Sequence, residues 1–366
     1  MKTKTFDRHI HDLLTIAPTD APFVSCYLDM LGRDRSEVLA DFDQQAHLAV
    51  EGYVGGRLDS LHAALRNIRE YLVENFDLGT ASIACFARCS SSAYFLAMPF
   101  KVALPSEFHV SRRPRIYPLM EARDLYDRFL LVVTTDFEAS IFEMSLGSTT
   151  GEYSPEDLLS IKKSIPCITK ERYHHDRLPS ERDLVSEKVR ILGELVDEKD
   201  YKSILLAGDD ARVASLYEAL PPILKTKAIP VGADASVACV EEVYEEAIDT
   251  FREHEKTQSF DRVLTLSERV LAGGLAVTGV DACVSALEDG FAEVLILNRA
   301  LEATEDRERL VRAAALAGVE VETVADSRLL NTLGGAGCLL RYHSSHQPDA
   351  LLFEDELLML SPVLAS

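Results

Sequence analysis

The stretch GVDACVSALEDGFAEVLIL, from Gly279 to Leu297, places a run with helical spacing directly before a run of apolar residues. Apolar positions recur at three- and four-residue intervals up to Gly290, which is typical of a helix that ends at a glycine. A second helix and strand pair follows at 306–324, and TLGGAGCLLRYH (332–343) then leads from a glycine-rich loop into another apolar strand. This alternation predicts a compact α/β/α sandwich in the last quarter of the chain.

The glycine-rich loop holds Gly334, Gly335 and Gly337. Glycine adopts positive φ without strain and lets another backbone approach closely. Two explanations stay open, because the turn may need these φ values or the loop may contact a partner. The sequence GGAG does not match G-x-G-x-x-G and precedes a strand, and LAGDDARVA lacks the lysine of a P-loop. We therefore expect no nucleotide and no other cofactor.

Upstream of this sandwich the pattern predicts two further α/β units. Two strands at 128–147, a helix at 184–198, a strand–turn–helix at 201–220 and a long helix at 237–273 indicate a largely parallel sheet. Before them, helical spacing at 37–76 with a Gly-Gly interruption precedes two apolar strands at 81–89 and 93–100, and 114–127 is predicted to be a connection. The predicted domains are a mixed α/β domain at 1–123, a central domain at 124–270 and a C-terminal domain at 271–366.

Composition indicates a globular protein of the cytoplasm. The chain has 366 residues, 47% of them hydrophobic and 27% charged, and its start lacks the apolar core of a signal peptide. The most apolar run, AYFLAMPFKVAL, is too short to cross a bilayer, so no membrane partner is expected. Seven scattered cysteines are typical of reduced, buried thiols.

The net charge of −22 argues against a protein that wraps DNA or bare RNA over a wide surface. Two local clusters of cations stand out from this acidic background. SRRPR (111–115) carries Arg112, Arg113 and Arg115, and the loop at 162–182 carries six cations against three acids. Both clusters are candidates for RNA phosphate contacts, and the alternative is that they are ordinary solvated loops.

No catalytic or metal-binding constellation is predicted. Cys85 and Cys89 have no second ligand pair nearby and would point to one face of a strand, as core residues do. His174 and His175 are adjacent in sequence and would point apart on a strand or helix. The chain has neither G-x-S-x-G nor H-E-x-x-H. We therefore predict that it is not an enzyme and holds no metal.

The C-terminal pattern resembles that of the archaeal and eukaryotic class-1 peptide chain release factors and of Pelota. In that family a helix–strand with the pattern G-V-x-x-x-x-x-A-L-x-x-G precedes a glycine-rich loop and an L-R-Y strand. The matching residues are Gly279, Val280, Ala286, Leu287, Gly290, Leu295, Gly334, Gly335, Gly337, Leu340, Arg341 and Tyr342. Upstream, ILLAGDDARVASL (204–216) resembles a segment of the family's central domain. The resemblance covers residues 128–343, and it implies an RNase H-like central domain.

One departure from the family concerns its chemistry. The release factors carry a Gly-Gly-Gln loop before the central helix for peptidyl-tRNA hydrolysis, and here that position holds CITKERYHHDRLPSERD (167–183). The chain is in this respect similar to the bacterial branch of the family, which includes the ribosome hibernation factor Balon. The resemblance implies a factor that occupies the ribosomal A site together with a translational GTPase such as elongation factor Tu.

We therefore expect a ribosome-binding factor that protects idle ribosomes. Two alternatives stay open: a rescue factor that hydrolyses peptidyl-tRNA through His174 or His175, and a protein-interaction module that does not bind ribosomes. The residues predicted to contact rRNA are Lys170, Arg172, His174, His175, Arg177, Arg182, Arg112, Arg113 and Arg115. The residues predicted to contact the GTPase are Gly334, Gly335, Gly337 and Arg341.

Overall fold

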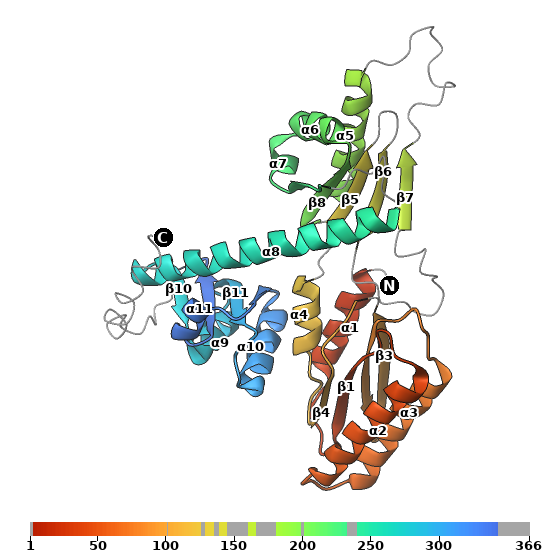
Figure 1. Cartoon of the computed structure of the whole chain (residues 1–366). Helices are drawn as coiled ribbons and strands as arrows, with labels where there is room; N and C mark the ends of the chain where they lie inside the picture. The colour runs from red at the N-terminus through yellow and green to blue at the C-terminus, as the bar shows by residue number, and fades with distance from the viewer. Residues whose placement is uncertain are drawn as a thin grey trace. The chain divides into compact units, whose positions relative to one another are not determined.

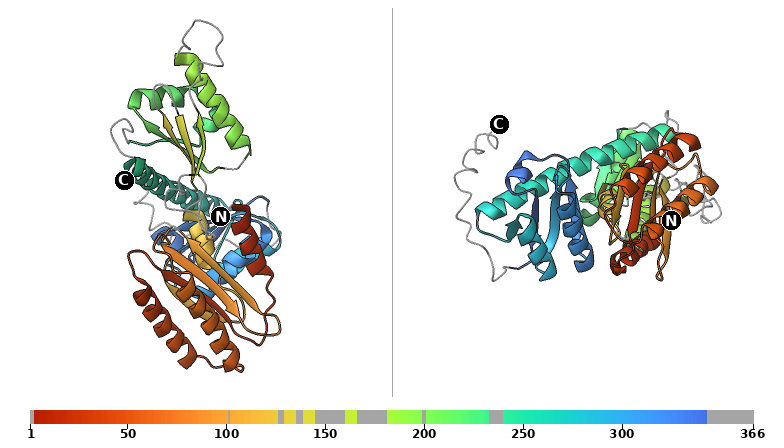
Figure 2. Two further views of the ribbon diagram at one scale, coloured as in Figure 1. Left: turned by 90° about the vertical axis from the view of Figure 1, so that its right-hand side faces the viewer. Right: turned by 90° about the horizontal axis from the view of Figure 1, so that it is seen from below.

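Three β-sheets organise the chain, each with its own helices (Figures 1 and 2). A computed structural model describes residues 3–100, 102–125, 129–134, 139–144, 160–165, 181–198, 201–232 and 240–342. Two compact units result, one formed by Met1–Pro118 with Leu125–His254 and the other by Leu119–Asp124 with Glu255–Ser366. The predicted α/β fold is confirmed, whereas the predicted domain boundaries at residues 123 and 270 stay a prediction.

The first sheet has the order β3-β2-β1-β4, and each neighbouring pair is antiparallel. Helices α2 and α3 cover one face, where Leu61 and Ile68 pack against Val24 and Cys26 of β1. The two strands predicted at 81–89 and 93–100 are present as β2 and β3, and they pair antiparallel. The elements of this region are α1 (Thr3–Thr15), β1 (Phe23–Asp29), α2 (Arg35–Glu51), α3 (Leu58–Glu74), β2 (Ser82–Arg88), β3 (Tyr94–Phe100), β4 (Glu107–Ser111) and α4 (Tyr117–Leu125).

Local sequence explains where α2 begins and why it stops. The side chain of Asp34 accepts from the backbone N–H of Glu37, and the Glu37 carboxylate accepts from the N–H of Asp34, which is a capping box. The Gly-Gly interruption then separates α2 from α3, as predicted. Arg57, at the start of α3, has φ 71°, which a residue other than glycine rarely adopts.

The central sheet has the order β7-β6-β5-β8-β9. Strands β5, β8 and β9 are parallel to one another, and β6 is antiparallel to both of its neighbours, β5 and β7. Alternate residues of β5 supply two cores, Leu130 and Val132 on the side of α5 and α6, and Phe129 and Leu131 on the side of α8. The elements are β5 (Phe129–Thr134), β6 (Ala139–Met144), β7 (Ser160–Ile165), α5 (Glu181–Glu198), β8 (Ser203–Gly208), α6 (Asp210–Ala219), α7 (Pro222–Lys225), β9 (Ala228–Pro230) and α8 (Val240–Leu271).

The third sheet has the order β10-β13-β11-β12, with β11 and β12 parallel and β13 antiparallel to both of its neighbours. One core lies between this sheet and the last part of α8, where Val263 and Leu266 meet Ile296 and Leu339. The elements are β10 (Ala276–Thr278), α9 (Val280–Glu288), β11 (Ala292–Asn298), α10 (Thr304–Ala317), β12 (Glu320–Val324), α11 (Arg328–Thr332) and β13 (Ala336–Leu340).

Two sequence predictions are wrong in detail. The segment 114–127, predicted to be a connection, contains helix α4. The short helix α11 precedes the glycine-rich loop and was not predicted, because five residues are too few for a periodic pattern. Among the described residues, no helix combines the length and the apolar character that crossing a membrane requires.

The structure explains why the central ILLAGDD motif has a glycine at position 208. It ends β8 with φ 143° and lies opposite Thr134 of β5 in the parallel register. A Cβ atom at this position would come within 2.3 Å of the Thr134 carbonyl oxygen. Backbone cannot move aside as a flexible side chain can, so only glycine fits here.

We expect Gly208→Ala to lower the free energy of unfolding by about 2–3 kcal/mol, because it adds both a backbone clash and an unfavourable φ. The measurement is urea unfolding followed by circular dichroism.

Gly193→Ala is the matched control, since Gly193 lies inside α5 with no atom within 4 Å of an added Cβ. It should raise the free energy of unfolding by roughly 0.5–1 kcal/mol through helix propensity. Equal effects of the two substitutions would contradict this explanation of Gly208.

Candidate functional site

The first basic cluster follows β4, and the structure divides its three arginines. Arg112 and Arg113 are exposed, whereas Arg115 is only 7% exposed. The Ser111 hydroxyl donates to the Arg113 carbonyl oxygen at 2.6 Å and helps to shape this turn. Two neighbouring exposed guanidinium groups remain available for a phosphate-bearing partner.

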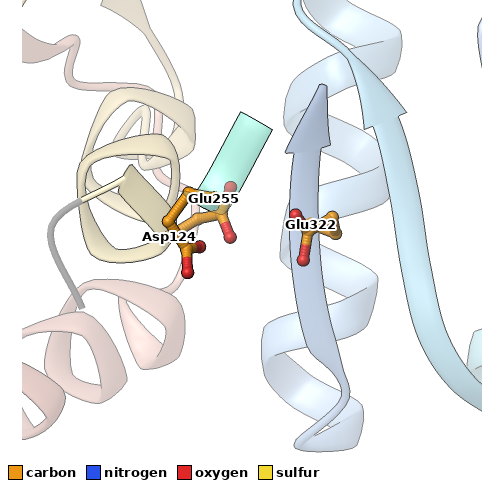
Figure 3. A group of neighbouring side chains, drawn as sticks. All are labelled: Asp124, Glu255 and Glu322. Carbon is orange, nitrogen blue, oxygen red and sulfur yellow. The ribbon is translucent and has the colours of Figure 1, made fainter. Parts of the chain in front are cut away.

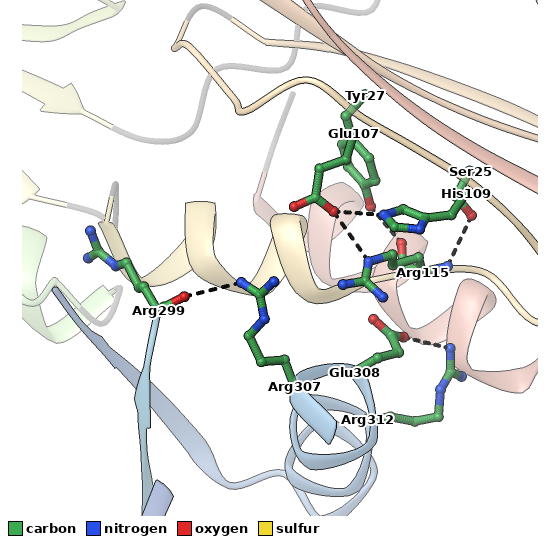
Figure 4. A network of polar contacts seen from close by, with 9 residues as sticks. All are labelled: Ser25, Tyr27, Glu107, His109, Arg115, Arg299, Arg307, Glu308 and Arg312. Carbon is green, nitrogen blue, oxygen red and sulfur yellow. Dashed lines mark hydrogen bonds and ion pairs between the residues drawn. The ribbon is translucent and has the colours of Figure 1, made fainter. Parts of the chain in front are cut away.

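Arg115 is instead buried beside strands β1 and β4 of the first sheet (Figure 4). Its Nε donates to Glu107 at 3.3 Å, its backbone N–H donates to the Ser25 hydroxyl at 3.0 Å, and its carbonyl accepts from the Tyr27 hydroxyl at 2.6 Å. His109 lies 3.0 Å from the same Glu107 oxygen. These contacts argue against the predicted rRNA contact of Arg115. The sequence SRRPR gave no sign that its third arginine is buried.

The second basic cluster lies almost wholly outside the described residues. The predicted contact residues that lie outside the described part are Lys170, Arg172, His174, His175 and Arg177. The described part includes Lys162 and Lys163 in β7, and Arg182 in the first turn of α5. The predicted rRNA contacts of this loop therefore stay predictions.

The glycine-rich loop lies where β13 begins, beside the carboxyl end of β11. Gly334 and Gly335 have φ 88° and 75°, and the Asn298 backbone N–H donates to the Gly335 carbonyl at 2.9 Å. A Cβ on Gly335 would come within 2.8 Å of Leu301. Both glycines therefore have a structural reason to be glycine, while Gly334 is also exposed. The predicted contact with a GTPase stays open.

Gly337 and Arg341 differ from these two glycines in their surroundings. Gly337 is buried inside β13, and a Cβ there would come within 2.3 Å of the Leu266 side chain. Arg341 is exposed just beyond the other end of β13, where its N–H donates to the carbonyl of Phe291, the residue before β11. Five residues of an extended strand, about 16 Å, separate the two ends. The four predicted partner residues therefore do not form one contiguous surface.

Three carboxylates gather where α4, α8 and β12 meet (Figure 3). The oxygen atoms of Asp124, Glu255 and Glu322 lie within 4.8 Å of one another. Asp124 accepts from both the backbone N–H and the hydroxyl of Thr323, each at 2.7 Å. These three residues come from distant parts of the sequence, so no motif indicated the cluster.

A cation of the chain itself balances this cluster. Arg262 of α8 lies 3.1 Å from Glu322 and 3.0 Å from Glu320, and the Ser259 hydroxyl donates to the other oxygen of Glu322. Burial alone would lower the pKa of Arg262, but the carboxylates of Glu322 and Glu320 outweigh it and raise that pKa. Arg262 and the hydroxyl donors thus stabilise two of the three carboxylates, Asp124 and Glu322.

The predicted core role of the cysteines at 85 and 89 agrees with their surroundings. Cys85 is fully buried opposite Cys26, and burial raises the pKa of its thiol to about 12. The side-chain amide of Asn67 donates to the Cys89 sulfur at 3.3 Å.

Several known proteins are similar to this chain. Residues 114–252 match the sequence profile of bacterial archaeo-eukaryotic release factor family 10. A protein pelota homolog from Methanocaldococcus jannaschii is 26% identical over 225 residues, which are 59% of this chain and 61% of the relative. The match thus spans less than two thirds of that relative.

Solved structures from the same group are also similar. Archaeal Pelota, in a model of ribosome-bound Pelota and ABCE1, is 20% identical over 72% of this chain and 78% of its own, with a TM-score of 0.43. Saccharomyces cerevisiae Dom34, described as a translation termination-like factor that interacts with Hbs1, is 14% identical over 74% and 82%, also with a TM-score of 0.43.

These matches show that the chain is similar to Pelota and to the release factors, and that its residues 114–252 match a bacterial family of that group. The resemblance found from the sequence motifs is thereby confirmed.

We expect Arg262→Ala to lower the free energy of unfolding by about 2–3 kcal/mol, because it leaves buried carboxylates without their cation. This value is below that of a fully buried pair, since the Arg262 side chain is 28% exposed. Chemical denaturation at pH 7 measures it.

Arg309→Ala is the control for charge removal. Arg309 pairs with Asp281 in a bridge whose side chains are 51% and 89% exposed, and such a pair contributes at most about 1 kcal/mol. A similar loss for both variants would show that Arg262 does not balance the cluster.

Glu107 should make the stability of the chain depend on pH. Burial acts to raise its pKa, but hydrogen bonds and charges from His109 and Arg115 outweigh burial and lower it. A lowered folded pKa contributes stability above the ordinary value of about 4.3, and that contribution is lost as the pH falls through the folded value. Glu107→Gln should therefore destabilise the chain at pH 6, with a deficit that shrinks as the pH falls below about 4.

Unfolding midpoints from pH 7 to pH 3 test this expectation. Glu70→Gln on the exposed surface of α3 is the matched control and should follow the wild-type pH profile. A deficit of Glu107→Gln that stays constant over the whole range would contradict it.

Proposed function

We propose that the chain is a ribosome-binding factor that occupies the A site of idle ribosomes and protects them without hydrolysing peptidyl-tRNA. The observation that carries this proposal is the combination of a Pelota-like central and C-terminal region with a basic segment in place of Gly-Gly-Gln. The family's hydrolysis needs that glutamine to position water. A chain that keeps the fold and lacks the tripeptide retains binding without that chemistry.

The charge distribution supports contacts with rRNA at a few local clusters of cations. With a net charge of −22, the body of the chain repels phosphate, so rRNA contacts must concentrate where cations cluster. Arg112 and Arg113 form one exposed pair, and the segment 162–182 forms the other cluster. Arginine and lysine bind phosphate oxygens without any catalytic arrangement.

The partners of the relatives extend the proposal. Archaeal Pelota is described as ribosome-bound together with ABCE1, and yeast Dom34 as interacting with Hbs1. We infer that this chain likewise works with a translational GTPase, and elongation factor Tu is the bacterial candidate. The exposed Gly334, in the loop before β13, belongs to the surface that we assign to this partner.

Sedimentation with vacant bacterial ribosomes at increasing salt tests the proposal. The chain should comigrate with ribosomes at low salt, and its affinity should fall steeply as salt rises. A variant that loses four cations of the basic segment should bind more weakly and with a salt slope smaller by about 3. These four substitutions are Lys170→Ala, Arg172→Ala, Arg177→Ala and Arg182→Ala.

The control variant removes four exposed cations elsewhere and should bind like the wild type. It combines Arg8→Ala, Arg66→Ala, Arg190→Ala and Arg309→Ala. Equal loss in both variants would mean that total charge rather than the basic segment governs binding. Comigration at no salt concentration would refute ribosome binding and favour a protein-interaction module.

Release of labelled peptide from stalled ribosomes separates protection from rescue. The proposed factor releases none. Release that disappears on changing His174 and His175 to alanine would establish the rescue activity instead, because imidazole is the plausible base at neutral pH.

A further inference from the structure

Arg88, at the end of β2, is a buried cation whose contacts are all with uncharged groups. The residue is only 5% exposed. Its Nη1 atom donates to the Ala17 carbonyl oxygen at 2.9 Å and to the Thr19 hydroxyl at 3.5 Å. Its Nε atom donates to the Ser92 carbonyl oxygen at 3.4 Å, and its Nη2 atom donates to the Ser92 hydroxyl at 3.2 Å. The guanidinium carbon lies 5.7 Å from the centroid of the Phe23 ring.

Arg115, which is also buried beside the first sheet, shows what Arg88 lacks. Arg115 pairs with the carboxylate of Glu107, whereas Arg88 forms no ion pair with a carboxylate of the described residues. Burial and then the charge of Asp12 raise the pKa of Tyr94, which is opposite Arg88 in the register of β2 and β3, yet Asp12 does not pair with Arg88 itself. A buried charge without a counter-ion is costly, because carbonyl and hydroxyl groups replace only part of its hydration. An added anion at Arg88 is therefore stabilised.

A turn of three serines joins β2 to β3 and brings hydroxyl groups to this cation. Ser91 and Ser92 are exposed, and the Ser92 N–H donates to the Ser90 hydroxyl at 3.2 Å, which helps to shape the turn. An exposed turn of small polar residues is accessible to a modifying enzyme. Ser92 thus combines an exposed position with a direct hydrogen bond from the buried guanidinium.

We propose that Ser92 is a phosphorylation site whose phosphate is bound by Arg88, an inference that goes beyond ribosome binding and does not depend on it. In the reaction, the Ser92 Oγ atom attacks the γ-phosphorus of ATP held by a serine kinase. The bond from this phosphorus to the β-phosphate oxygen breaks, ADP leaves with the electron pair, and the hydroxyl proton passes to a base of the kinase. The resulting phosphate carries a charge of about −1.5 to −2 at pH 7.

The hydrogen bonds of Arg88 leave a donor for this phosphate. A guanidinium has five N–H groups, and the four bonds to Ala17, Thr19 and Ser92 use all but one, on Nη2. Phosphate oxygens accept charge-assisted hydrogen bonds from arginine that are stronger than those to a neutral hydroxyl. The phosphate then ties the serine turn to the loop of Ala17 and Thr19, because Arg88 already contacts both.

Phosphorus NMR of the full chain with phosphoserine incorporated at position 92 tests the contact. The second ionisation of phosphoserine has an ordinary pKa of about 6. In the folded chain this pKa should fall by about one unit or more, because the guanidinium favours the dianion. The same chain unfolded in urea gives the reference and should titrate near pH 6. Equal values in the folded and unfolded chain overturn the proposal.

Phosphoserine at position 91 is the matched control. It adds the same charge to the same turn, but the Ser91 hydroxyl makes no hydrogen bond with Arg88, so its pKa should stay near the unfolded value. Arg88→Gln should return the pKa of phosphoserine at position 92 to the same value. An equal shift at position 91, or a shift that survives Arg88→Gln, overturns the assignment. Where the glutamine variant does not fold, the urea reference and the position-91 control decide the outcome.

Peptide mapping by mass spectrometry tests whether the modification occurs. The chain is isolated from its native cells during growth and during starvation, and a phosphate on Ser92 is expected in at least one of these states. Its absence in both overturns the proposal. Ribosome sedimentation does not enter either measurement, so a failure of the proposed function leaves this result unchanged.

Discussion

The carboxylate of Asp124 accepts two hydrogen bonds from Thr323, and the unit formed by Leu119–Asp124 and Glu255–Ser366 depends on this contact. Strand β12 is the edge of its sheet, and an edge strand exposes backbone N–H groups that attract other strands. Asp124 satisfies one such N–H, and Arg299 donates to the Thr323 carbonyl at 3.2 Å. Asp124, which lies 199 positions before Thr323 in the chain, thus covers part of the exposed edge of β12.

This contact has an electrostatic cost, which Arg262 offsets. Asp124 brings its charge next to Glu255 and Glu322, and buried carboxylates repel one another strongly in a medium of low dielectric constant. Arg262 supplies the cation, and Ser259 and Thr323 supply hydroxyl donors. The chain's own donors therefore stabilise Asp124 and Glu322 within a cluster that resembles a metal site by its residue types.

Local charge decides where the chain can meet rRNA in the function that we propose. Arg112 and Arg113 are exposed cations suited to rRNA, while Arg115 next to them is buried against Glu107. An overall acidic chain can meet RNA at such a place because the contact depends on local charge within about one Debye length, roughly 8–10 Å.

The sequence by itself determined many of the longer helices and apolar strands, since apolar periodicity and glycine stops report local structure directly, but it missed short elements such as α4 and α11. It also carried the resemblance to Pelota and the release factors, through GVDACVSALEDG and GGAGCLLRY. Only the tertiary structure decided which polar residues are surface and which are interior. Arg115 and Arg112 look alike in SRRPR, and the difference depends on Glu107, Ser25 and Tyr27 from other strands. Likewise, Gly334 and Arg341 are close in sequence but lie at opposite ends of β13, because an extended strand separates residues that a loop would keep together.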